Sequence, residues 1–85
     1  MAIEMLYFAW VREKVGVGAE RIDPPATVRT VADLIAWLAA RSPGHAAAFA
    51  EPDRIRAAID DRFVGVTAVI GDAREIALFP PVTGG

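Results

Sequence analysis

The chain has 85 residues, 54% of them hydrophobic, and its nine Lys and Arg against 11 Asp and Glu give a formal net charge of −2. That length suits a single domain, residues 1–85, built on one hydrophobic core. The slightly acidic balance argues against nucleic-acid binding, which needs a basic stripe. No apolar run approaches the ~20 residues of a membrane span, so no membrane partner is expected.

Reactive side chains are scarce. The chain has no cysteine and a single histidine, His45. The absence of cysteine excludes disulfides, thiolate zinc sites and a cysteine nucleophile. The presence of only one histidine disfavours a histidine metal site or a self-contained Ser-His-Asp triad. Glu4 stands where a secretion signal has Lys or Arg, so a cytoplasmic protein is expected. We expect such a chain to carry or bind something, without a bound metal or cofactor.

The first third of the sequence predicts a hairpin. Ile3 to Val11 is rich in β-branched and aromatic residues, which is typical of a strand. Glycines at positions 16 and 18 indicate a turn, and Glu20 to Asp23 then forms a short second strand. Pro24-Pro25 ends that strand because neither proline can donate to a strand ladder.

The middle of the chain predicts one main helix. Thr30 is a good N-cap, and Asp33 three residues later approximates a capping box. Apolar side chains then follow at i, i+3, i+4 and i+7, so we expect an amphipathic helix running to about Arg41. Residues 42–44 break it, and the Ala-rich stretch His45 to Ala50 predicts a second, short helix. For His45, a surface or capping role is preferred over metal ligation.

The last third predicts further strands. Arg54 to Ile59 is expected to be a strand, Asp60-Asp61 a turn and Phe63-Val64 the start of the return. Residues 65–71 are expected to be irregular or a short strand, and Glu75 to Phe79 forms the last strand. The first and last strands can pair only through a crossover, so the order predicts an α+β fold, a mixed sheet over one main helix.

Large apolar side chains stand on strand faces that also carry glutamate. Leu6 and Phe8 alternate with the inward residues of the first strand and share the face of Glu4, while Phe79 shares the face of Glu75. If the two strands are neighbours, these side chains form an exposed apolar patch with Phe63 at its margin. Patches of this kind mark partner surfaces.

The C-terminal tail, residues 80–85, is the strongest feature. Pro80-Pro81 holds the chain extended directly after the last strand, and Gly84-Gly85 ends it without any Cβ atom. Such a thin end can enter a narrow channel and present its carboxyl group inside another protein. A carboxylate is a poor electrophile at neutral pH, because its pKa is roughly 3.5. Acyl chemistry on it therefore requires activation, best as an adenylate made by a partner that uses ATP.

Four segments of this chain together resemble one family. LYFAWVREKVG, TVADLIAWL, AAID and FPPVTGG look like the small subunit of molybdopterin synthase. The resemblance spans nearly the whole chain and implies the ubiquitin-like β-grasp fold. The chain departs from the family at Asp60, where Asn is usual, and at Asp72-Ala73-Arg74-Glu75, where a Gly-Asp-Glu turn is usual. Both departures affect a turn and leave the tail unchanged.

The resemblance implies a specific role. An E1-like enzyme would adenylate the Gly85 carboxylate, and a sulfur-donating protein would convert it to a thiocarboxylate. The tail would enter the active site of a large subunit and donate sulfur to cyclic pyranopterin monophosphate, within a heterotetramer whose catalytic side chains belong to the large subunit. Gly84 would help deliver the sulfur, and the partner interface would comprise Phe8, Phe63, Phe79, Pro80, Pro81, Val82 and Thr83.

Three other functions remain open. A β-grasp sulfur carrier for thiamine thiazole or cysteine synthesis would share the tail chemistry but have another partner. A ubiquitin-like modifier would instead join Gly85 to lysines by isopeptide bonds. A plain interaction module would have an idle tail, and deleting Gly84 and Gly85 would then change nothing.

Overall fold

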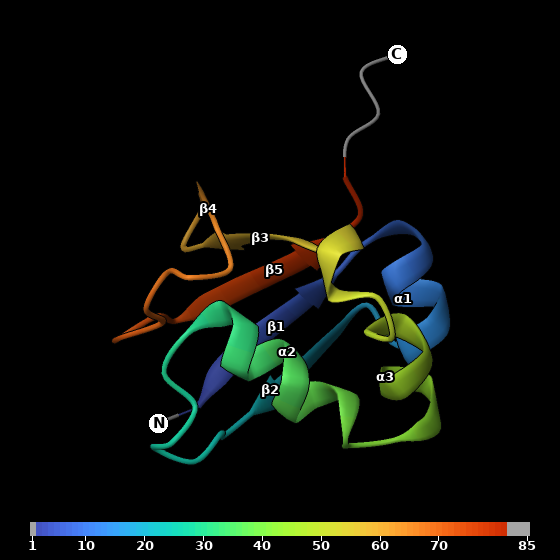
Figure 1. Ribbon diagram of the computed structural model, residues 1–85, viewed down its shortest axis with the longest axis horizontal. Coiled ribbons are helices and arrows are strands. Elements are labelled where there is room, and N and C mark those ends of the chain that lie inside the picture. The colour runs from blue at the N-terminus through green and yellow to red at the C-terminus, as the bar shows by residue number, and fades with distance from the viewer. Residues whose placement is uncertain (1, 82–85) are drawn as a thin grey trace.

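The computed structural model describes residues 2–81, which form one five-stranded sheet with three α-helices and a 3₁₀ turn (Figure 1). In chain order the elements are β1 (Ile3–Tyr7), α1 (Ala9–Val15), β2 (Ala19–Ile22), α2 (Val31–Ala39), α3 (Pro43–Ala48), η1 (Pro52–Arg54), β3 (Arg56–Ile59), β4 (Arg62–Val64) and β5 (Glu75–Phe79).

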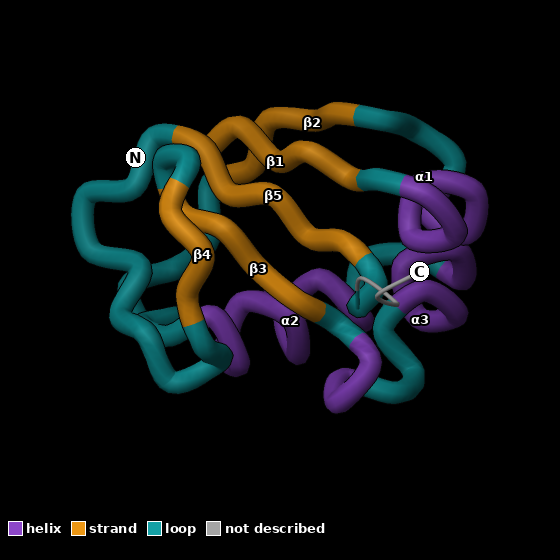
Figure 2. Tube along the Cα trace, turned by 90° about the horizontal axis from the view of Figure 1, so that it is seen from above, coloured by secondary structure: helices purple, strands orange, loops and turns teal. Residues whose placement is uncertain are grey.

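The sheet is mixed, with the strand order β2-β1-β5-β3-β4 (Figure 2). The last strand, β5, is central: it runs parallel to β1 on one side and antiparallel to β3 on the other. Two antiparallel pairs, β1 with β2 and β3 with β4, complete the sheet. The predicted α+β class and the crossover pairing of the first and last strands are therefore confirmed.

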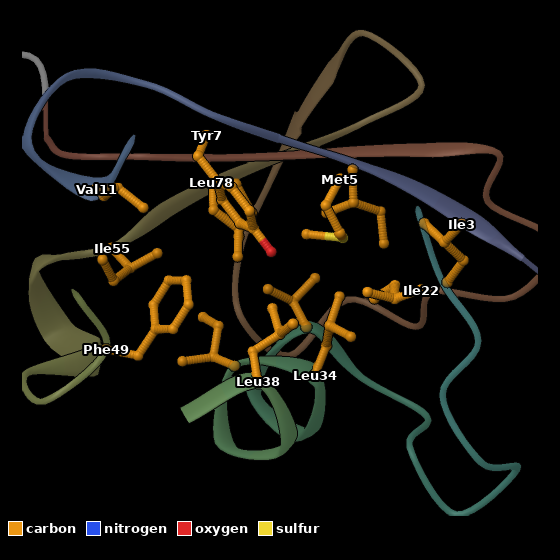
Figure 3. Packing of buried hydrophobic residues seen from close by; sticks show 14 of the residues in the cluster. Ile3, Met5, Tyr7, Val11, Ile22, Leu34, Leu38, Phe49, Ile55 and Leu78 are labelled. Atoms are coloured by element: carbon orange, nitrogen blue, oxygen red, sulfur yellow. The ribbon is translucent and has the colours of Figure 1, made fainter. Parts of the chain in front are cut away.

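The core lies between one face of the sheet and α2. Alternate residues of β1 and β5 point inward, and among them Met5, Tyr7 and Leu78 are at most 1% exposed. They meet Leu34 and Leu38 of α2, as Figure 3 shows. Alternation along the strands and 3.6-residue spacing along the helix place these apolar side chains together.

The predicted start of α2 is confirmed. The Asp33 backbone N–H donates to Thr30 Oγ1 over 3.1 Å, and the Thr30 N–H donates back to Asp33 Oδ2 over 3.2 Å. The Arg29 N–H donates to the same carboxylate, and these backbone hydrogen bonds hold the pKa of Asp33 below its ordinary value. The helix ends at Ala39, two residues before the expected limit.

The predicted antiparallel pairing of the first two strands is confirmed, but the short turn expected between them is wrong. The first strand stops at Tyr7 rather than Val11, and the helix α1 follows it before β2 begins. Val11 is fully buried, so residues 9–15 gain more from packing one helical face on the core than from extending the strand. Gly16 closes the helix in the left-handed conformation, with φ of 100°.

The second half of the chain follows the prediction with small shifts. Arg54 belongs to η1, so β3 starts at Arg56, whereas β5 has the predicted bounds. Residues 65–71 form no strand, although Val69 makes an isolated bridge to Thr30. Asp60 and Asp61 form the predicted turn, and both have the positive φ that a tight hairpin of this kind requires. No helix within residues 2–81 is long and apolar enough to cross a membrane.

Candidate functional site

The sheet face opposite α2 carries an apolar row that crosses all five strands. Leu6 of β1 is aligned with Ala19 of β2 on one side and with Ala77 of β5 on the other. Ala77 is aligned with Ala58 of β3, and Ala58 with Phe63 of β4. We call these residues, together with Phe8 and Phe79, the outer apolar face: Phe8, Ala19, Leu6, Ala77, Ala58, Phe63 and Phe79.

Two phenylalanines form the most prominent part of this face. Phe63 is 83% exposed, and its ring centroid lies 5.8 Å from that of Phe79, with the rings inclined at 65°. Such an edge-to-face arrangement is favourable for aromatic pairs. The two rings and Arg56 border a hollow of about 290 Å³. Phe8 is 49% exposed beside α1, whereas Phe79 is half-buried, so Phe63 is the most exposed of the three predicted interface aromatics.

The base of the tail is held firmly. β5 is paired with β3 up to its last residue, where Phe79 is aligned with Arg56, and with β1 up to Leu78. On the other side the Phe8 backbone N–H donates to the Leu78 carbonyl over 3.3 Å. Pro80 and Pro81 follow and are half-buried. A chain leaving a central strand therefore starts from a defined position and direction.

The remaining predicted tail residues, Val82, Thr83, Gly84 and Gly85, lie outside the described residues. Their assigned roles stay predictions from the sequence.

A second cluster lies under the opposite face of the sheet, where polar side chains converge on Glu20. The Tyr7 O–H donates to Glu20 Oε2 over 2.6 Å, and His45 Nε2 lies 2.6 Å from the same oxygen. His45 Nδ1 lies 2.7 Å from Ser42 Oγ, which also accepts the His45 backbone N–H at the start of α3. His45 thus takes part in helix capping as expected, but it is buried rather than at the surface.

Burial and hydrogen bonding shift the pKa values in this cluster. Burial raises the pKa of Tyr7, and its hydrogen bond to Glu20 raises it further. Burial alone would raise the pKa of Glu20, but hydrogen bonds from Tyr7 and His45 and the charge of Arg41 lower it. The Arg41 guanidinium lies 4.0 Å from Glu20 Oε1. The cluster joins β1, β2 and α3, so its geometry indicates a structural role.

No constellation in the described part of the chain supports catalysis or metal binding by itself. Within residues 2–81, no three His, Asp or Glu side chains are grouped to hold a metal ion. Trp10 and Trp37 pack at the margin of the core. The chemical possibilities are therefore concentrated in the outer apolar face and the tail that leaves beside it.

The sequence interpretation missed four residues of this region. Ala19, Ala58 and Ala77 belong to the apolar row, and Arg56 is aligned with Phe79 at the end of β5 where the tail begins. Alternation along β3 and β5 contains the signal, because it places Arg56 and Ala58 on the face of Phe79. Small alanines are hard to recognise as part of a surface until the strand order is known.

Comparison with known proteins assigns the chain to a family. The sequence profile of the ThiS family matches residues 5–85, which include β1 from Met5 onward, the other four strands, the outer apolar face and the whole tail. The chain belongs to the ThiS family.

Relatives of established function agree with this assignment. The chain is 40% identical over 83 residues to the molybdopterin synthase sulfur carrier subunit of Escherichia coli strain K12, covering 98% of this chain and 99% of that protein. It is 34% identical over 89 residues to the protein of the same name from Haemophilus influenzae, with the same coverage. The resemblance noted from the four sequence segments is therefore confirmed.

Solved structures of similar proteins show the same architecture. The molybdopterin converting factor subunit 1 from Pyrococcus furiosus superposes with a TM-score of 0.76 at 28% identity, covering 96% of this chain and 99% of that one. SAMP1 from Haloferax volcanii covers both chains fully, with a TM-score of 0.71 at 26% identity. These similarities and the mixed sheet packed on α2 confirm the expected ubiquitin-like β-grasp fold of this ThiS-family chain.

Proposed function

We propose that this chain is the sulfur carrier subunit of a molybdopterin synthase. The observation that carries the proposal is the full-length similarity, 40% identity over 98% of the chain, to a protein of that name. The match to the ThiS family continues through residue 85, so the Gly-Gly end is part of the shared sequence. A chain without cysteine must hold any transferred sulfur at its backbone terminus.

The proposed chemistry takes place at the Gly85 carboxyl group. An E1-like partner joins it to AMP from ATP and releases pyrophosphate, which makes the carbonyl carbon electrophilic. A sulfur-donating protein then supplies sulfide equivalents, AMP leaves, and a thiocarboxylate forms. The tail delivers this sulfur to cyclic pyranopterin monophosphate. No cofactor is held by the chain itself, and ATP is consumed by the activating partner.

The rest of the chain binds the large subunit and directs the tail into its active site. The outer apolar face binds the large subunit, with the exposed Phe8 and Phe63 and the half-buried Phe79 as its anchors, because large aromatic side chains are frequent anchors of interfaces. Pro80, Pro81, Val82 and Thr83 carry Gly84 and Gly85 into the partner's active site. The proposed assembly is a cytoplasmic heterotetramer with one carrier at each end of a pair of large subunits.

Intact-mass measurement tests the proposal. The purified chain is incubated with an activating enzyme, ATP and a sulfur donor, and we expect a mass change of one oxygen-to-sulfur exchange. A variant that lacks Gly85 should show no change while keeping the circular-dichroism spectrum of the parent. Sulfur uptake by the truncated chain would contradict the mechanism.

A second function is favoured by one observation. SAMP1 from Haloferax volcanii resembles the chain over its full length, and a further solved structure, of the H. volcanii small archaeal modifier protein 1, shares its fold. A modifier would form isopeptide-linked conjugates of higher mass in a cell extract supplied with ATP. A sulfur carrier of the thiamine or cysteine pathways would take up sulfur in the same way but would not bind the molybdopterin synthase large subunit.

A further inference from the structure

Arg56 is a charged residue set into the outer apolar face. It is aligned with Phe79 across the β3–β5 pair, and it borders the hollow of about 290 Å³ together with Phe63 and Phe79. The next outward residues of these strands, Ala58 and Ala77, are small and apolar. A partner that covers the two aromatic rings must therefore also cover the Arg56 guanidinium.

The guanidinium is oriented within the free chain. Arg56 Nη1 donates to the Asp53 carbonyl over 2.9 Å and to the Ile55 carbonyl over 3.2 Å, and both carbonyls are backbone groups at the end of η1. The two contacts use the same nitrogen, so the donors on Nη2 and Nε have no hydrogen bond within residues 2–81. The free Nη2 and Nε groups form one open edge of the planar guanidinium, and such an edge is suited to bidentate binding of a carboxylate.

No carboxylate of the described chain neutralises this charge. The arginines that form ion pairs within residues 2–81 are Arg21, Arg41 and Arg54, and Arg56 is in none of these pairs. Elsewhere on this face, Glu4 and Arg21 are 3.7 Å apart and compensate each other. Glu75, at the opposite end of β5 from Phe79, forms no ion pair with Arg56 within residues 2–81. Arg56 is thus the unneutralised charge beside the most exposed aromatic ring of the face.

Covering an unpaired guanidinium with apolar atoms is unfavourable, because the charge loses its hydration without compensation. Neutral acceptors would satisfy its N–H groups but would leave a net charge in the interface. A carboxylate satisfies both requirements in one group.

On these grounds we propose that Arg56 is a specificity-determining residue for the docking partner, and that the large subunit presents an Asp or Glu carboxylate opposite it, at the edge of an apolar contact with Phe63 and Phe79. The inference rests on the proposed function, since it names a feature of the same partner. Arg56 then selects large subunits with a carboxylate at this position over those that are apolar there.

The test is a titration of the cognate large subunit with Arg56→Leu, measured by calorimetry at low and physiological salt. Leucine adds apolar area to an apolar face, so a purely apolar partner surface would bind this variant as tightly as the parent or more tightly. A carboxylate partner would instead lose its counter-charge, and we expect affinity to fall by about tenfold or more. The parent should also show a steeper loss of affinity with salt than the variant.

Two controls separate the possible outcomes. Arg29→Leu removes the same charge beside α2, away from the outer face, and should change affinity by no more than about twofold. Phe79→Asp should abolish binding if the outer face is the docking surface. Undiminished binding of Arg56→Leu alongside loss of binding by Phe79→Asp would overturn the role of Arg56 alone. Absence of binding by the parent chain would overturn the proposed function and this inference with it.

Discussion

The ring of Phe63 on β4 reaches across β3 to lie 5.8 Å from the ring of Phe79 on β5. The strand between them presents Ala58 at this level, aligned with Phe63, and its methyl group leaves room for the two rings to approach. Two residues 16 positions apart thereby form one aromatic surface beside the point where the tail leaves the sheet. The pair is open to solvent on the side of Phe63, which is the property expected of an interface anchor.

Truncating Phe63 should separate binding from stability. Because its side chain is 83% exposed, Phe63→Ala should change the free energy of unfolding by no more than about 0.5 kcal/mol in urea denaturation. Binding of the large subunit should weaken by about tenfold or more, because the ring is proposed to be an anchor. Val69→Ala is the matched control: Val69 is 69% exposed, is not part of the outer apolar face and should leave the affinity unchanged. Equal affinities for Phe63→Ala and the parent would remove Phe63 from the interface.

Asp60 should tolerate asparagine but not alanine. Its carboxylate accepts the backbone N–H groups of Arg74 over 3.1 Å and of Glu75 over 3.0 Å, and its φ is 47°. Asn keeps an acceptor oxygen and tolerates the left-handed conformation, so Asp60→Asn should stay within about 0.5 kcal/mol of the parent. Asp60→Ala loses both properties and should cost about 1–3 kcal/mol.

Chemical denaturation of the two Asp60 variants measures this difference. The result also bears on the departure from the family, which usually has Asn here. The structure shows that Asp can replace Asn here, because the side chain is needed as an acceptor for the backbone N–H groups of Arg74 and Glu75. Equal destabilisation by Asn and Ala would show that the negative charge itself is required.

Local patterns predicted much of the fold because some elements are defined by their own residues. The bounds of β5 and the capping box at Thr30 and Asp33 were found in this way, from alternation in one case and side-chain chemistry in the other. The helix α1 was missed for the opposite reason. Its N-cap is Phe8, whose side chain cannot accept a capping hydrogen bond. Ala9 has a φ of 52°, which the local sequence does not predict. Only packing against the core stabilises a helix there.

In the candidate site too, some residues were predicted from local patterns and others depend on the tertiary structure. The tail and the three proposed interface aromatics could be selected from the sequence because proline, glycine and phenylalanine on an outward strand face have few other roles at such positions. Arg56 and Ala58 could be placed in the site only once the strand order was known, because β3 lies between the strands that carry Phe63 and Phe79. The contact of Glu20 with His45 joins residues 25 positions apart and depends on how α3 docks, which no periodicity encodes.

Gly44 is required where α3 meets α1. A Cβ atom at this position would lie 2.6 Å from the Lys14 carbonyl oxygen and 3.0 Å from that of Val15, and both are backbone atoms that cannot rotate away. Gly44→Ala should therefore force the two helices apart and cost about 1–3 kcal/mol of unfolding free energy. Thermal or urea unfolding measures the loss.

Gly65 offers a matched control for that substitution. A Cβ atom there meets nothing within 4 Å, and its φ is not in the left-handed region. Gly65→Ala should be neutral or stabilise the chain by up to about 1 kcal/mol, because alanine restricts the unfolded state. If Gly44→Ala were as harmless as Gly65→Ala, the close approach of α1 and α3 would not be needed for stability.

Glu20 should make the folded state sensitive to acid. Burial opposes its charge, but hydrogen bonds from Tyr7 and His45 prevail and lower the pKa of Glu20 in the folded chain. The folded state then binds fewer protons than the unfolded state below the ordinary glutamate pKa of about 4.3. The contribution of Glu20 is thus fully present above that pH and is lost as the pH falls through the lower, folded-state value.

Unfolding of the parent and of Glu20→Gln from neutral pH down into the acid range tests this sign. The variant should be less stable near neutral pH by about 1–3 kcal/mol, since a buried charge-assisted network loses its acceptor charge, and the difference should shrink as the pH falls below about 4. Glu51→Gln is the control: the Glu51 side chain is 69% exposed and forms an exposed pair with Arg54 at 3.8 Å, so the substitution should leave stability almost unchanged at every pH. A difference between parent and Glu20→Gln that stays constant into acid would mean that the charge of Glu20 does not stabilise the fold, and that the shape of the side chain alone holds β2 against α3.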